Sequence, residues 1–208
     1  MYYEIKMGND NHRYSGLGTI LQVYLNDVSV VCPQCNKEAH VTVDNPWLLN
    51  NAKLKCFNCM FSQSVEELAR YNVILNRNCD NCGNKISITI TSQREKSNDI
   101  RVTCKKCGIS RSFKPRNEVY YLKYNENINA NDPVFGLPLW FQTDVRGNLF
   151  WALNREHLLE IKNYVGSKLR ERKVKSYTTM VEKLPTFIRD AKNREAIMKA
   201  IERLQKKN

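Results

Sequence analysis

The chain has 208 residues, eight of them cysteine, and carries 33 Lys and Arg against 21 Asp and Glu, a formal net charge of +12. This length suits one medium domain or two to three small ones, each with a modest core. No run approaches the roughly 18 apolar residues of a membrane span, and the N-terminal stretch lacks the apolar segment of a secretory leader, so we expect a cytoplasmic protein, outside membranes, with reduced thiols.

All the cysteines lie in the first 107 residues, as four C-x-x-C pairs. Twenty residues separate the first pair from the second, and twenty-one separate the third from the fourth, which is an internal repeat. Two such pairs at this separation are typical of tetrahedral four-cysteine zinc. The spacing predicts two zinc ions, and iron–sulfur or redox chemistry is the alternative that shares it. The predicted ligands are Cys32, Cys35, Cys56, Cys59, Cys79, Cys82, Cys104 and Cys107.

Residues 29–71, after an N-terminal segment of residues 1–28, form the first predicted metal domain. The stretch "HVTV" after the first pair and "KLK" before the second predict two strands, joined by the apolar loop "DNPWLL". In a zinc knuckle the residue after the second cysteine often has positive φ, which asparagine tolerates and glycine adopts without strain. Asn36 fits this pattern and Met60 departs from it, so the second knuckle is predicted to be the least regular.

Residues 72–117 form the second predicted metal domain, where Gly83 and Gly108 follow the two pairs. Between the pairs, "KISITIT" and "DIRVT" flank a polar turn and predict a β-hairpin, and "ISRSF" predicts a further strand. Because each repeat contains its own hairpin, we predict that the two pairs of one repeat share one metal. In the alternative, interleaved arrangement, the first and third pairs share a site.

With "CPQC…CFNC" and "CDNC…CKKC", residues 29–116 resemble the zinc-ribbon superfamily, in particular the transcription-factor-IIB-type ribbons of bacterial proteins of unassigned role. The resemblance implies two β-hairpin-rich zinc ribbons in tandem. It implies no single function, because ribbons serve polymerases, ribosomal proteins, helicases and adaptors alike. The C-terminal segment also resembles the tail of such bacterial proteins.

Residues 118–135 contain the polar, asparagine-rich stretch "NENINANDP" and are predicted to be a linker. In the C-terminal domain, residues 136–208, "LPLWFQT" and "LFWALN" flank "DVRGN" and predict a hairpin whose aromatic residues belong to the core. Asn154 and Asn193 are predicted to cap two helices. The predicted fold class is therefore small α+β: two tandem four-cysteine zinc ribbons followed by a domain with a hairpin and two to three helices.

Positive charge is concentrated in two regions. Residues 79–116 carry nine Lys and Arg against three Asp and Glu, and residues 136–208 carry sixteen against eight. Eight thiolates on two zinc ions lower the formal total only to about +8. Such an excess favours attraction to phosphates. The candidate nucleic-acid-binding residues are Lys105, Lys106, Arg111, Lys114, Arg116, Arg170, Arg172 and Lys173. A further basic face on the last predicted helix, Lys199, Arg203 and Lys206, is predicted to be solvated surface.

These features predict a zinc-ribbon protein that binds DNA or RNA, as an accessory component of a larger nucleic-acid-processing, defence or mobile-element machine. The alternative is a protein-binding adaptor or toxin-neutralising partner with structural zinc, which the apolar loop of the near-neutral first repeat favours. An enzyme is the least favoured class, because four cysteines close each site and no catalytic motif or small-molecule substrate is evident. His12, His40 and His157 are not predicted to be ligands.

Overall fold

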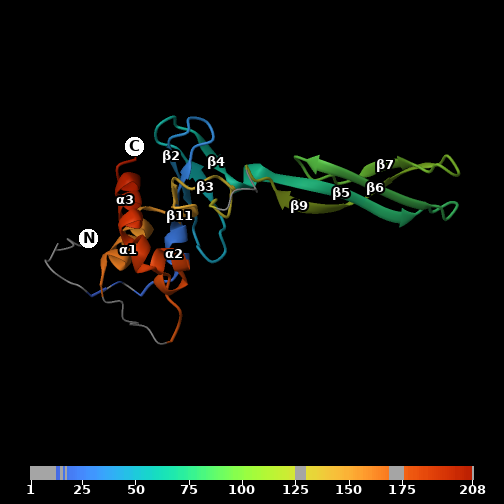
Figure 1. The fold of residues 1–208 in the computed structure, drawn as a ribbon. Coiled ribbons are helices and arrows are strands. Elements are labelled where there is room, and N and C mark those ends of the chain that lie inside the picture. The colour runs from blue at the N-terminus through green and yellow to red at the C-terminus, as the bar shows by residue number, and fades with distance from the viewer. Residues whose placement is uncertain (1–12, 15, 17, 125–129, 169–175, 208) are drawn as a thin grey trace. The chain divides into compact units, whose positions relative to one another are not determined.

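The computed structural model describes residues 13, 14, 16, 18–124, 130–168 and 176–207. The fold is small and α+β, with antiparallel strand pairs and few helices (Figure 1). It divides into two compact units. Unit 1 comprises the described parts of Met1–Gln63 and Asn125–Asn208, and unit 2 is Ser64–Tyr124. Among the described residues, no helix has the length and apolar character needed to cross a membrane.

Unit 1 contains a four-stranded sheet built from the first repeat. Its strands follow chain order and are β1 (Asp27–Val31), β2 (Glu38–Thr42), β3 (Lys53–Lys55) and β4 (Ser62–Ser64). A short 3-10 helix, Leu21–Asn26, precedes β1. Strands β2 and β3 correspond to the two strands predicted around the apolar loop, and they pair antiparallel.

The rest of unit 1 is a hairpin covered by helices. The hairpin of β10 (Phe141–Val145) and β11 (Asn148–Ala152) confirms the predicted one. It is followed by α1 (Arg155–Gly166), α2 (Thr186–Arg189) and α3 (Arg194–Gln205), with short 3-10 turns at Val181–Lys183 and Ala191–Asn193. Figure 1 shows α1 and α3 side by side next to β11.

The two predicted helix caps differ in outcome. The side chain of Asn154 accepts a hydrogen bond from the backbone N–H of His157 at 2.8 Å, so it caps α1 as predicted. Asn193 immediately precedes α3, but its side chain makes no capping bond. Its amide donates instead to the carbonyl of Phe187 at 2.9 Å, so Asn193 occupies the predicted N-cap position of α3 without the capping bond.

The core of unit 1 joins the first repeat to the C-terminal elements. Strand β1 meets the segment before β10: Val30 bridges Leu139, and the backbone N–H of Trp140 donates to the carbonyl of Ser29 at 2.9 Å. The sequence placed residues 29–71 and 136–208 in separate domains, and the structure puts most of both in one unit. Its largest fully buried side chains include Phe135, Phe141, Phe150, Leu54, Leu158, Ile161, Ile197 and Ile201.

The segment predicted to be a linker, residues 118–135, contains ordered structure at both ends. Its first residues belong to β9 (Arg116–Tyr121), which pairs with β5 of unit 2. Near its end Asp132 is buried, and its carboxylate accepts hydrogen bonds from the backbone N–H groups of Val134, Phe135 and Leu137. A buried turn of this kind has a polar composition because its backbone groups need a side-chain acceptor. Residues 125–129 lie outside the described residues.

Unit 2 is built from two small sheets. The first has the strand order β6-β5-β9, with β5 at Ala69–Asn78 and β6 at Lys85–Gln93, after a 3-10 turn at Val65–Leu68. The second is the hairpin of β7 (Ile100–Thr103) and β8 (Ser110–Phe113). The predicted strands therefore exist, but the predicted pairing of β6 with β7 is wrong, because β6 pairs with β5 and β7 with β8.

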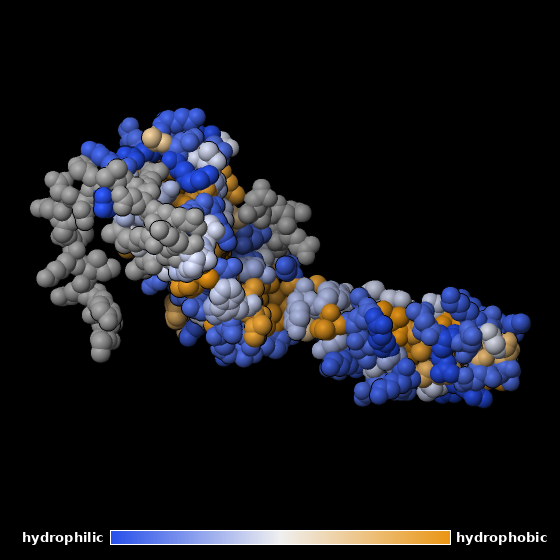
Figure 2. Space-filling view, turned by 90° about the horizontal axis from the view of Figure 1, so that it is seen from below, coloured by the Kyte–Doolittle hydropathy of each residue, from blue (hydrophilic) through white to orange (hydrophobic). Residues whose placement is uncertain are grey.

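The core of unit 2 is small and includes its cysteines. Leu75, Ile86 and Phe113 are buried together with Cys79 and Cys104. In Figure 2 hydrophilic residues form much of the visible surface of this unit, with apolar patches between them. With so few buried side chains, a metal ion bound by the four cysteines would supply much of the stability of this unit.

Candidate metal centres and basic surface

The eight cysteines form two groups of four, in the order predicted from the repeat. Within each group the four sulfur atoms lie within 4.8 Å of one another. This grouping is the predicted sequential arrangement, with both pairs of one repeat together, and not the interleaved one. The first group, cluster 1, is Cys32, Cys35, Cys56 and Cys59. The second group, cluster 2, is Cys79, Cys82, Cys104 and Cys107.

The distances between sulfurs fit ligands around a single ion. In cluster 1 the sulfur of Cys35 lies 3.6 Å from that of Cys56, and Cys32 lies 3.7 Å from Cys59. In cluster 2 the corresponding pairs are both 3.7 Å apart. A disulfide requires about 2.05 Å, and all eight cysteines are free. A tetrahedron with metal–sulfur bonds of about 2.3 Å has an edge of roughly 3.8 Å. Each group could therefore hold a metal ion.

Each C-x-x-C stretch is itself the turn of a β-hairpin. In all four turns the backbone N–H of the first cysteine donates to the carbonyl five residues later, at 2.7 to 2.9 Å. The four turns connect β1 to β2, β3 to β4, β5 to β6, and β7 to β8. The position of each cysteine pair is thus set by the backbone hydrogen bonds of its own hairpin. Two such hairpins bring four sulfur atoms together.

The residue after the second cysteine has positive φ in every turn. Asn36, Gly83 and Gly108 have φ of 58°, 67° and 73°, as the sequence predicts. Met60 also has positive φ, at 61°, although its side chain disfavours this conformation. The second turn therefore keeps the same backbone as the others, and its methionine side chain is exposed.

Backbone N–H groups in these turns favour the thiolate form of particular cysteines. The N–H of Lys37 lowers the pKa of Cys35 to about 6. The N–H of Cys107 is the main cause that lowers the pKa of Cys104 to about 6. Four thiolates this close repel one another strongly, so complete ionisation of a cluster requires a bound cation.

Neither of the two described histidines, His40 and His157, belongs to either cluster. His40 lies in β2, where its Nδ1 is 2.9 Å from a carboxylate oxygen of Asp27, and this hydrogen bond raises its pKa. His157 is buried in the first turn of α1. His12 lies outside the described residues. Within the described part of the chain, the two cysteine groups are the only sets of three or more metal-ligating side chains close enough to share an ion.

The predicted nucleic-acid-binding residues of unit 2 fall into two classes. Lys105 and Lys106 are exposed in the turn of cluster 2, and Lys114 is exposed just after β8. Within the described residues these three lysines form no ion pair. Arg111 lies 3.4 Å from a carboxylate oxygen of Asp80, and Arg116 pairs with Glu118. The positive charge of both arginines is therefore partly compensated by a neighbouring carboxylate.

The other three predicted residues, Arg170, Arg172 and Lys173, lie outside the described residues. The structure adds a cation that the sequence did not single out. Arg101 is opposite Ser112 on the face of the β7–β8 hairpin that points away from the core, and it is exposed. Its neighbours Ile100 and Val102 pack on the core, so strict alternation along β7 was the signal that could have identified it.

Apolar side chains are exposed at both ends of β3 in the first repeat. Trp47 and Leu48, between β2 and β3, are 66% and 72% exposed. Phe57 and Met60 are also exposed, in the second turn of cluster 1. Apolar side chains with this exposure are typical of contact with another macromolecule when they form a contiguous patch.

Comparison with known proteins does not add to these observations. No family model matches the chain, and neither curated proteins nor solved structures give a significant match.

Proposed function

We propose that both clusters bind zinc and that the two repeats are zinc ribbons in tandem. Support comes from the sulfur spacing, which matches tetrahedral thiolate coordination, and from a ligand set of four cysteines with no histidine. Four protein ligands leave no open coordination position, so the role of such zinc is structural. A multi-iron cluster would hold its four cysteines farther apart, around a larger inorganic body.

We further propose that unit 2 binds nucleic acid. The observation that carries this proposal is a set of exposed lysines without ion pairs on the β7–β8 hairpin: Lys105 and Lys106 lie in its turn, and Lys114 lies at its other end, near Arg101. The metal cluster would hold their backbone rigid, so binding a phosphate chain would order only side chains. Twelve Lys and Arg against six Asp and Glu give unit 2 a formal charge of +6 before any metal is counted. A surface of this charge attracts phosphates at long range.

This role requires binding and no catalysis. A chain with structural zinc and a phosphate-binding surface is suited to act as an accessory component of a larger nucleic-acid-processing, defence or mobile-element machine. Both DNA and RNA present the phosphates that such a surface would bind.

The proposal is tested by a salt titration of binding to a fluorescent single-stranded oligonucleotide. Each phosphate contact contributes about 0.7 to the slope of log affinity against log salt. The triple variant Lys105→Gln/Lys106→Gln/Lys114→Gln should reduce that slope by about 2 and should keep its metal. Arg111→Gln alone should have a smaller effect, because Arg111 already pairs with Asp80.

The matched control is Arg94→Gln/Lys96→Gln/Lys123→Gln, which removes three exposed cations of the same unit away from cluster 2. It should retain more of the salt dependence than the first variant. An equal loss in both variants would show that binding is diffuse, and absence of binding by the wild type at low salt would contradict the proposal.

A second candidate function, protein binding, is favoured by the exposed Trp47 and Leu48 in the loop of the first repeat. Aromatic and apolar anchors of this kind dominate protein interfaces. Affinity purification from the native cell, with and without nuclease, separates the two candidates. Partners lost on nuclease treatment favour nucleic-acid binding, and partners that persist and depend on Trp47 favour an adaptor or a toxin-neutralising partner.

A further inference from the structure

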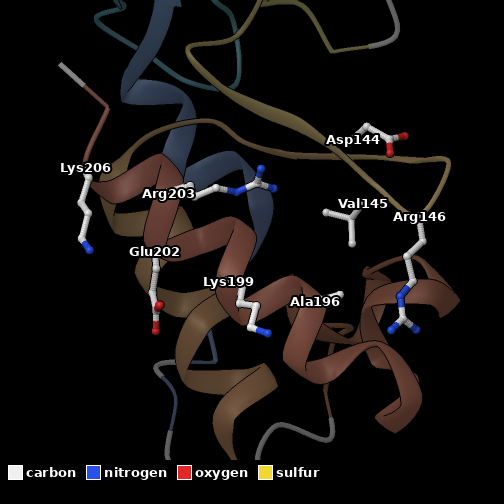
Figure 3. A pocket seen from close by; sticks show the side chains of 8 residues that line it. All are labelled: Asp144, Val145, Arg146, Ala196, Lys199, Glu202, Arg203 and Lys206. Atoms are coloured by element: carbon white, nitrogen blue, oxygen red, sulfur yellow. The ribbon is translucent and has the colours of Figure 1, made fainter.

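Unit 1 has a hollow between the β10–β11 turn and α3, remote in sequence from both cysteine clusters (Figure 3). Its volume is about 580 Å³, within the range of ligand sites. Val145 and Ala196 supply the apolar part of its lining, and charged side chains supply the rest. The charged residues are Asp144, Arg146, Lys199, Glu202, Arg203 and Lys206.

The turn between β10 and β11 fixes one end of the hollow. Arg146 and Gly147 both have positive φ, 54° and 76°, as in the tight turns that join two antiparallel strands. The guanidinium of Arg146 donates to the carbonyl of Lys192 at 3.1 Å and to the side-chain oxygen of Asn193 at 3.0 Å. These bonds hold Arg146 against the start of α3 with its remaining donors available to a ligand.

Helix α3 supplies Lys199 and Arg203 to the hollow, and Lys206 directly follows its last residue. Lys199, Arg203 and Lys206 are spaced by four and three residues, so they share one face over about 10 Å of helix. In Figure 3 Arg203 extends from α3 toward the turn. Lys199 pairs with Glu195 at 2.6 Å, while Arg203 and Lys206 form no ion pair within the described residues.

The charges of the lining favour an anion. The lining contains four cationic side chains and two carboxylates. One of these carboxylates, that of Asp144, already accepts a hydrogen bond from the N–H of Gly147 at 3.1 Å. The pair between Lys199 and Glu195 is exposed, and exposed pairs are weak enough to exchange for a ligand oxygen. A single phosphate would meet only part of this row of cations, whereas linked phosphates would meet all of it.

We propose that this hollow binds a chain of linked phosphates, with Arg203 and Lys199 as the main contacts and Arg146 as a fixed donor at one end. The site goes beyond the nucleic-acid surface of unit 2, since it needs no residue of that unit. The chain can be the backbone of a nucleic acid or a free polyphosphate. Both offer the same oxygens at repeated spacing, and Val145 and Ala196 leave room for groups attached to them.

The test measures binding of two probes at low salt, inorganic tripolyphosphate and a fluorescent single-stranded oligonucleotide. Lys199→Gln/Arg203→Gln should weaken tripolyphosphate binding roughly tenfold. Glu202→Gln removes a carboxylate of the lining and should strengthen it several-fold, a gain that damage to the fold would not produce. The matched control, Lys53→Gln/Lys183→Gln, removes two exposed cations of unit 1 outside the hollow and should bind as the wild type does.

The outcomes separate the two sources of phosphate. If Lys199→Gln/Arg203→Gln binds both probes more weakly, the hollow binds nucleic acid as well as polyphosphate. If only tripolyphosphate binds more weakly, the hollow is a site for free polyphosphate. Unchanged affinity of the variant for both probes, or no binding of either probe by the wild type, overturns the proposal. The triple lysine variant of unit 2 should keep its affinity for tripolyphosphate at the hollow. The proposal for the hollow can therefore hold even if unit 2 does not bind nucleic acid.

Discussion

Replacing Cys104 with serine should unfold unit 2 and lower the metal content from two ions to one. Cys104 is 2% exposed, and its sulfur lies 3.7 Å from that of Cys82. Structural zinc contributes on the order of 10 kcal/mol, comparable with the whole stability of a small domain. The buried core of unit 2, with few side chains besides the cysteines, cannot replace it. Metal analysis and amide hydrogen exchange measure both effects.

The matched control is Thr103→Ser, a change at the exposed neighbour of Cys104 in β7. It should leave the metal content and the exchange pattern as in the wild type. Retention of two tightly bound ions by Cys104→Ser would contradict the assignment of cluster 2.

The second large effect concerns pH. His157 is 2% exposed, and its Nδ1 accepts a hydrogen bond from the backbone N–H of Leu153 at 3.1 Å. Burial lowers its pKa from 6.5 to about 4. Above pH 6.5 the ring is neutral in the folded and unfolded states alike. As the pH falls from 6.5 to 4, only the unfolded state gains a proton, so His157 should cost about 3 kcal/mol of stability over this range.

Urea denaturation at several pH values measures this loss. His157→Gln keeps a side-chain acceptor for Leu153 but does not titrate, so its free energy of unfolding should fall less between pH 6.5 and 5 than that of the wild type. His40 acts in the opposite direction, because its hydrogen bond with Asp27 raises its pKa. The difference between wild type and variant removes this contribution. Equal pH dependence in both would contradict a neutral, buried His157.

The two cysteine clusters could be predicted from sequence because their determinants are local. A C-x-x-C pair sets its own turn through backbone hydrogen bonds within the turn. The two pairs of one repeat, each in its own hairpin turn, form one group of four cysteines. The cap at Asn154 and the β10–β11 hairpin were predictable for the same reason. Each depends on residues within a few positions of one another.

The packing of distant segments could not be predicted in this way. The bridge between Val30 and Leu139 joins residues more than a hundred positions apart, and no periodicity in either segment identifies the other. Strand β9 was not predicted, because the polar stretch that follows it, "NENINANDP", is typical of a linker. The pairing of β6 was missed because alternation in "KISITIT" predicts a strand without specifying its partner.

The hollow of unit 1 shows the same limit. The spacing of Lys199, Arg203 and Lys206 was visible in the sequence, and taken alone it predicts only a solvated helix face. Arg146 joins them through the turn of a separate hairpin. A concave site requires both elements, and only the fold brings them together.

Native mass spectrometry of the full chain, purified under reducing conditions, tests the central claim most directly. If two four-cysteine zinc sites organise the chain, the mass should correspond to two zinc ions per chain, with eight cysteines as the ligand total. A ratio near one, or iron in place of zinc, would contradict the account.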